Sequence, residues 1–329
     1  MTSPFGKPFE VQPRSTVSTL IVRPEIGLDV SAPASKIPLG ATPLSDNYIM
    51  REGALEPRSM LTRVGGTPQP LGDERVLGGL EVVDLSAVRY ALASGTTRLA
   101  YLSGATWAVA TFLAASTGTE QVTPGGDSLD YWDWTQIYSD RADQIMAVGV
   151  KNLRYVPYAW VAGATTFSAL TGAPGARCVA AFDNYLVLGN LDSDRPQRVQ
   201  WSDRGSASSW TGGLSGFEDL LQAKGEIRRI VPLENRCIVF FDDETWYGTS
   251  GEFPSVLRFT PLDTTVGCPY PRTVVGTPQG VLFLGRDLQV YLLPKEGGQA
   301  QPVGQRLHRA IRDTLVQPAR AFAVWDSAA

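Results

Sequence analysis

The chain has 329 residues and a formal net charge of −4, and 43% of its residues are hydrophobic. Its 33 glycines and 23 prolines interrupt the sequence too often for long helices, so the composition predicts a turn-rich β protein with a sizeable core. The negative net charge argues against tight binding to nucleic-acid phosphates. The sequence has neither an apolar run of membrane-spanning length nor a signal-peptide pattern at the amino terminus, so we expect synthesis in a cytoplasm and no export by the usual route.

Residues 1–78 are predicted to form an extended amino-terminal arm. Prolines recur throughout this region and break any regular element. Three short stretches, residues 20–22, 48–50 and 60–61, are apolar enough to dock as single strands on the same chain or on a neighbouring subunit. The residues expected at such an interface are Leu20, Ile21, Val22, Ile26, Leu28 and Val30.

Residues 79–305 repeat a unit made of a short apolar strand, a tight turn and an outgoing strand. The first strands are expected at residues 88–95, 144–149, 185–190, 237–243 and 280–285. The outgoing strands are expected at residues 98–102, 153–156, 198–203, 245–248 and 288–293. Successive copies lie roughly 40 to 57 residues apart, which is close to the period of one four-stranded propeller blade.

These hairpins cannot be stable alone, because each buries only one face. We therefore predict an all-β fold with a β-propeller-like domain of about 5 to 7 blades, completed by the chain itself, by the amino-terminal arm or by a neighbouring subunit. The alternative is a β-sandwich in which the similarity between the hairpins is fortuitous.

The carboxyl-terminal region, residues 306–329, is predicted to contain a short helix and a terminal strand. Residues 305–315 place apolar side chains at helical spacing with arginines on the opposite side, and Pro318 would end the helix. Residues 320–325 are predicted as a strand.

The sequence offers little catalytic chemistry. Its one histidine, His308, lies on the predicted helix without a nucleophile motif around it, so a structural or surface role is expected. No phosphate-binding loop, dinucleotide pattern or zinc motif occurs, and we predict neither a cofactor nor a metal site. Cys178, Cys237 and Cys268 are widely spaced and are expected to be buried thiols.

One stretch combines acidic and aromatic side chains, namely Asp130 followed by Tyr131, Trp132, Asp133 and Trp134. Glycoside cleavage needs two carboxyl groups beside aromatic surfaces, so Asp130 and Asp133 are candidates if the chain is a propeller hydrolase. Residues 131–134 are the candidate contact if it is a receptor- or glycan-binding module. We favour a structural alternative, in which aspartates cap turns and aromatic rings fill the wedges between blades, and predict no enzyme activity.

An ordered series of short phrases resembles structural proteins of tailed bacteriophages. The phrases are residues 176–190, 198–203, 225–227, 239–247, 266–268, 280–285 and 302–306, with Trp210 and Phe259. Residues 27–31, 47–49, 53–55 and 57–58 resemble the opening of the same family, in which an extended arm precedes the ring. The resemblance covers nearly the whole chain.

This family includes tail hub or nozzle subunits of short-tailed phages, which form rings below the portal and adaptor and carry a β-propeller on each subunit. The resemblance implies a structural virion protein of the tail that forms part of the DNA ejection conduit. The implied partners are copies of the chain in a ring, expected as a hexamer, the head-to-tail adaptor, and tail fibre or spike proteins. Phage DNA would pass transiently without specific binding, and deleting residues 1 to about 50 is expected to abolish assembly but leave the propeller folded.

Overall fold

The structure, a computed structural model, describes residues 71–325 except 105, 115–120, 128, 141–142, 153–154, 192–193 and 253–255, together with four short strands nearer the amino terminus. Contacts between residues divide the chain into two units, Met1–Arg58 with Ala329, and Ser59–Ala328. Within the described residues, no helix has the length and apolar character needed to cross a membrane.

The described part of the first unit consists of two strand pairs. β1 (Gly27–Leu28) pairs in parallel with β2 (Ala41–Thr42), and β3 (Tyr48–Arg51) forms an antiparallel hairpin with β4 (Ala54–Pro57). Residues 48–50 thus lie in a strand, which pairs locally with β4; their docking on another surface stays a prediction. Leu28 lies in β1, whereas the other predicted interface residues lie outside the described residues: Leu20, Ile21, Val22, Ile26 and Val30.

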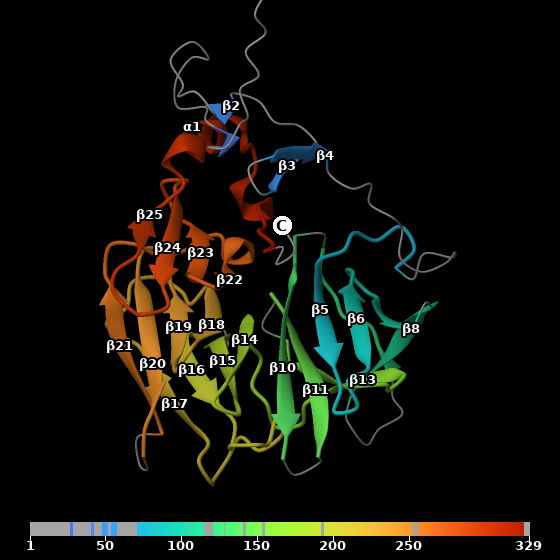
Figure 1. The fold of residues 1–329 in the computed structure, drawn as a ribbon. Coiled ribbons are helices and arrows are strands. Elements are labelled where there is room, and N and C mark those ends of the chain that lie inside the picture. Colours follow the sequence, from blue (N-terminus) through green and yellow to red (C-terminus); the bar gives the residue numbers. More distant parts are fainter. Residues whose placement is uncertain are drawn as a thin grey trace, which may run out of the picture. The chain divides into compact units, whose positions relative to one another are not determined.

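The described part of the second unit contains five blades of four antiparallel strands (Figure 1). The first blade is β5 (Gly78–Val83), β6 (Arg89–Ser94), β7 (Leu99–Ser103) and β8 (Thr106–Leu113). The second is β10 (Trp132–Ser139), β11 (Gln144–Lys151), β12 (Tyr158–Val161) and β13 (Thr166–Ala169). The third is β14 (Cys178–Phe182), β15 (Tyr185–Leu191), β16 (Arg195–Trp201) and β17 (Gly216–Asp219).

The fourth blade is β18 (Arg229–Leu233), β19 (Arg236–Phe240), β20 (Thr245–Ser250) and β21 (Leu257–Asp263). The fifth is β22 (Val275–Thr277), β23 (Gly280–Leu284), β24 (Val290–Pro294) and β25 (Gln301–Pro302). The predicted all-β, propeller-like fold is thus confirmed. The predicted hairpins supply the two middle strands of the blades, except in the second blade, where only the first predicted strand matches, as β11.

The first two blades are joined into one sheet at their outer edges. There β13 pairs in parallel with β8, matching Phe167 with Phe112, and β9 (Gln121–Val122) adds to β8. The third, fourth and fifth blades are separate four-stranded sheets. The first two blades therefore form one hydrogen-bonded body.

The turn between β14 and β15 shows how local sequence sets the register. Asp183 and Asn184 have φ values of 46° and 60°, the left-handed conformation of a two-residue hairpin turn, which these short polar side chains tolerate. The turn pairs Phe182 with Tyr185. Every residue of β15 is buried, which accounts for the apolar run of residues 185–188 at its start.

Four apolar clusters fill the wedges between successive blades. Trp160 and Phe167 belong to the wedge between the first and second blades, and Leu186 to the wedge between the second and third. Cys237 lies in the wedge between the third and fourth, and Phe283 in the wedge between the fourth and fifth. Among the described residues no such cluster joins the fifth blade to the first.

The carboxyl-terminal segment packs against the free side of the fifth blade. It comprises the helix α1 (Gln305–Thr314), the short helix η2 (Pro318–Arg320) and residues 321–325. An apolar cavity of about 340 Å³ between this segment and the blade is lined by Ile311 and Leu315 of the segment and by Leu282 and Val290 of the blade. The predicted helix is confirmed.

Two predicted strands are wrong. Residues 321–325 form no strand, because only one backbone bond in this stretch, from the Ala323 N–H to the Arg272 carbonyl oxygen (3.0 Å), ties it to a neighbour. The strand predicted at residues 153–156 is replaced by β12, which begins later, at Tyr158. Tyr155 and Val156 are exposed, and Pro157 has no N–H to donate to a ladder.

The buried thiols predict a loss of stability at alkaline pH. Burial raises the pKa of Cys237 from 9.0 to about 12 and that of Cys268 from 9.0 to about 11. Above pH 9 the unfolded chain releases these protons while the folded chain keeps them, so the free energy of unfolding falls as pH rises, by about 1.4 kcal/mol per pH unit for each thiol. Urea unfolding between pH 9 and pH 11 measures this slope.

The control is Cys237→Ala, which removes one ionisable thiol. Its slope should be smaller by about 1.4 kcal/mol per pH unit, whatever the substitution does to overall stability. An unchanged slope would show that the Cys237 thiol does not titrate differently in the folded and unfolded chains.

Candidate functional site

A cavity of about 420 Å³ lies where the blades meet at one end of their inner strands. Its walls come from residues 76–79 at the start of the first blade, residues 131–134 at the start of the second, and Arg229 at the start of β18. Pro271, Arg272 and Val274 before β22, with residues 322–324, complete the wall. We call this space the axial cavity.

Asp133 is the most deeply buried charge in the wall, with 1% of its surface exposed. Its carboxylate forms an ion pair with the Arg229 guanidinium and accepts a hydrogen bond from the Val179 N–H at 3.0 Å. Burial raises the pKa of Asp133, and Arg229 and the Val179 N–H oppose that rise. The side chain thereby links the first strands of the second, third and fourth blades.

Arg272 lies in the opposite wall between two aromatic rings. Its guanidinium carbon is 6.0 Å from the centre of the Tyr131 ring and 5.7 Å from that of Phe322. Burial lowers the pKa of Arg272, and Tyr131 opposes this shift. Burial also raises the pKa of Tyr131, an effect to which the Asp133 charge adds.

The two tryptophans of the aromatic-acidic stretch, Trp132 and Trp134, pack inside the protein. Their rings stack with the centres 5.4 Å apart and an angle of 17° between the planes. The Trp132 indole N–H donates to the Gly95 carbonyl oxygen at 3.0 Å, and the Trp134 indole N–H donates to the Ser94 hydroxyl at 3.1 Å. Their faces therefore belong to the core, while Tyr131 and Asp133 supply the polar part of the wall.

Asp130 serves the turn that precedes β10. Its carboxylate accepts the Asp127 N–H at 2.7 Å, and Asp127 in turn accepts the Leu129 N–H at 2.6 Å. These are the turn-capping bonds that short acidic side chains commonly make. The glycan-contact and hydrolase alternatives stay predictions.

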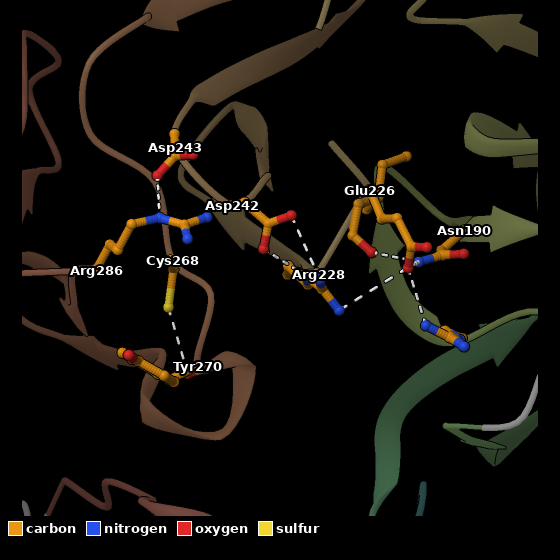
Figure 2. Close-up of polar contacts among 10 residues, drawn as sticks. Asn190, Glu226, Arg228, Asp242, Asp243, Cys268, Tyr270 and Arg286 are labelled. Atoms are coloured by element: carbon orange, nitrogen blue, oxygen red, sulfur yellow. Dashed lines mark hydrogen bonds and ion pairs between the residues drawn. The ribbon is translucent and has the colours of Figure 1, made fainter. Parts of the chain in front are cut away.

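A polar band connects the third, fourth and fifth blades (Figure 2). Glu226 accepts hydrogen bonds from Arg177 at 2.9 Å and from Asn190 at 3.2 Å. Next along the band, Arg228 pairs with Asp242 at 2.8 Å, and Arg286 pairs with Asp243. Asp243, which follows β19 closely, thus connects the fourth blade to the fifth.

The remaining reactive side chains are dispersed. His308 lies on α1, and its Nε2 contacts the Asp287 carbonyl oxygen at 3.0 Å. The three cysteines are buried and unpaired. In the part of the chain that the structure describes, no group of three or more potential metal ligands comes together.

Sequence reasoning missed the two arginines of the axial cavity. Arg229 follows Arg228 at the start of a strand, and Arg272 lies in η1 (Pro271–Thr273), where nothing in the local sequence distinguishes them from surface arginines. Only the tertiary fold brings them to the aromatic-acidic stretch at residues 131–134.

No protein-family model and no curated protein matches this chain. Among solved structures, the extracellular domain of a one-component system of B. thetaiotaomicron matches with a TM-score of 0.43 and 12% identity, over 70% of this chain and 28% of that one. The WD40 β-propeller domain of Doa1 matches with a TM-score of 0.32 and 12% identity, over 70% and 83% of the two chains.

YCF48 from Cyanidioschyzon merolae matches with a TM-score of 0.30 and 9% identity, over 63% of this chain and 77% of that one. The chain thus spans less than a third of the one-component-system chain that it matches. Scores this low carry no functional information, and the strand topology is what defines the fold.

Proposed function

We propose that this chain is a structural subunit of a bacteriophage tail, which assembles with copies of itself into a ring below the portal and adaptor. The observation that carries the assembly is an exposed apolar cluster beside the fifth blade. It consists of Val76, Phe322, Val324 and Trp325, which are between 43% and 78% exposed. We call these residues the seam patch.

The seam patch lies at the one boundary where the blades lack a shared apolar wedge. Val76 and Phe322 line the axial cavity together, and Phe322 and Trp325 line the apolar cavity beside the fifth blade. Contiguous exposed apolar side chains mark protein interaction sites, and contacts between different faces of identical subunits generate rings. A neighbouring copy is the partner that this arrangement favours.

The assignment to a phage tail rests on the resemblance of the ordered phrases along the sequence, as do the adaptor, the tail fibre or spike proteins and the hexamer. The net charge of −4 supports a conduit wall, because a wall that bound DNA phosphates would retain its cargo. Synthesis in the host cytoplasm and incorporation into the virion are part of the same proposal.

Electron microscopy and light scattering of the purified protein test the assembly. We expect closed rings, and we expect the double substitution Phe322→Asp with Val324→Asp to reduce the assembly to single subunits, because two charges would then be buried at the contact. Leu221→Asp is the matched control, since Leu221 is 77% exposed and lies outside the seam patch. That variant should assemble normally.

Two results would contradict the proposal. One is a monomeric wild-type protein at all concentrations, and the other is a fully assembled ring of the doubly substituted variant. Deleting residues 1–50 tests the arm in the same way, with loss of rings and an unchanged circular dichroism spectrum expected.

A further inference from the structure

We propose that the axial cavity binds a small monocarboxylate that carries an apolar or aromatic group, with Arg272 as the residue that holds the carboxylate. The cavity shares Val76, Phe322 and Val324 with the seam patch, but the proposal does not rest on the assignment to a phage tail. It rests on the placement of one arginine, on the charges around it and on the shape of its surroundings.

Arg272 carries a charge that its neighbours do not neutralise. Among the described residues it forms no ion pair and no hydrogen bond through its side chain, although it is half-buried in the cavity wall. Partial burial of an unpaired cation carries a desolvation cost, which a bound anion would offset.

The two aromatic rings hold the guanidinium in place. Tyr131 and Phe322 contact it at cation–π distances, which leave its N–H groups without a protein partner. A planar guanidinium between these rings presents the paired donors that bind a carboxylate in a bidentate manner.

The charge balance of the wall selects a single negative charge. Arg229 and Asp133 neutralise each other, so Arg272 provides the one uncompensated charge among the lining side chains. One uncompensated positive charge in the wall balances one negative charge on the ligand. In addition, Arg229 Nε is buried without a hydrogen-bond partner, which leaves an unused polar atom in the same wall.

The remaining surface determines the rest of the ligand. The cavity, of about 420 Å³, lies within the range of small-molecule sites. Val76, Val324 and the rings of Tyr131 and Phe322 give it apolar sides. A carboxylate attached to a ring or a short apolar chain fits both the charge and these walls.

Fluorine NMR with 4-fluorobenzoate as the probe tests the site on the full-length protein. We expect wild type to broaden the probe signal in a saturable manner and to bind the neutral analogue 4-fluorobenzamide at least tenfold more weakly. Arg272→Met, which keeps the apolar stem, should weaken binding of 4-fluorobenzoate at least tenfold. Arg286→Met is the matched control, because Arg286 pairs with Asp243 outside the cavity, and it should bind the probe as wild type does.

Phe322→Ala provides a second variant in case Arg272→Met does not fold. Phe322 is 67% exposed, so the substitution should leave the core intact. It should weaken binding of the probe, because it removes one of the two aromatic rings beside Arg272. Equal binding of the probe by wild type and Arg272→Met would overturn the proposal, as would no saturable binding to wild type at about 5 mM probe. Inorganic phosphate that displaces the probe at equal concentration would overturn the choice of a monocarboxylate.

Discussion

Replacing Asp133 with alanine is expected to lower the free energy of unfolding by about 3–5 kcal/mol. The substitution leaves the Arg229 guanidinium without its counter-charge, in a wall where its side chain is only 22% exposed. It also removes the acceptor of the Val179 N–H. Urea unfolding followed by tryptophan fluorescence measures the change.

The size of this effect depends on which partner is left behind. The double substitution Asp133→Ala with Arg229→Met removes both charges, so it should recover a large part of the loss. Glu81→Ala is the control, because its 3.0 Å pair with Arg89 is exposed on both sides and should contribute less than about 1 kcal/mol. A loss below about 1 kcal/mol for Asp133→Ala would show that the buried pair is not what joins the inner strands.

The candidate site shows where sequence reasoning reaches its limit. The aromatic-acidic stretch stands out in the sequence, and it does supply one wall of the axial cavity. Its partners Arg229 and Arg272 come from positions 96 and 139 residues beyond Asp133, on segments whose local sequence is ordinary. A site assembled from four blades has no short-range signature, so only the fold could reveal it.

The strands also differ in how far the local sequence predicts them. The middle strand β15 was predictable because all of its residues are buried, so that an apolar run results. The outer strand β17 contains Gly216 and Asp219 and alternates between half-buried and exposed positions. Its strand conformation comes from pairing with β16, an effect that the local sequence does not encode.

The carboxyl-terminal segment gave one success and one failure for a related reason. The helix at residues 305–314 could be predicted from its own sequence, because its apolar residues recur at the spacing of an α-helix and form one stripe. Residues 321–325 have the composition of a strand but pair with no strand, and Phe322, Val324 and Trp325 stay exposed. Strand-forming composition without a partner is an expected property of a surface that pairs with another chain.

Replacing Trp160 with alanine is expected to lower the free energy of unfolding by about 3–5 kcal/mol. Trp160 is fully buried in β12 at the centre of the wedge between the first two blades. The centre of its ring lies 5.4 Å from that of Tyr90 and 5.7 Å from that of Tyr101 across the wedge. It stacks on Phe167 with the ring centres 6.0 Å apart. The change therefore removes contacts on both blades and leaves a cavity that a rigid pair of sheets joined by β8 and β13 cannot close.

Two further variants, Trp160→Phe and Trp325→Ala, show how much of the effect comes from the buried position of Trp160 and how much from its indole ring. Trp160→Phe keeps a ring in the wedge but loses the indole N–H that donates to the Ala164 carbonyl oxygen at 2.7 Å, so it should lose less than half as much stability as the alanine variant. Trp325→Ala should change stability by less than about 0.5 kcal/mol in the isolated subunit, because Trp325 is 43% exposed. If Trp160→Ala and Trp325→Ala cost the same, the first two blades do not depend on this wedge, and the parallel pairing of β8 with β13 must carry their association instead.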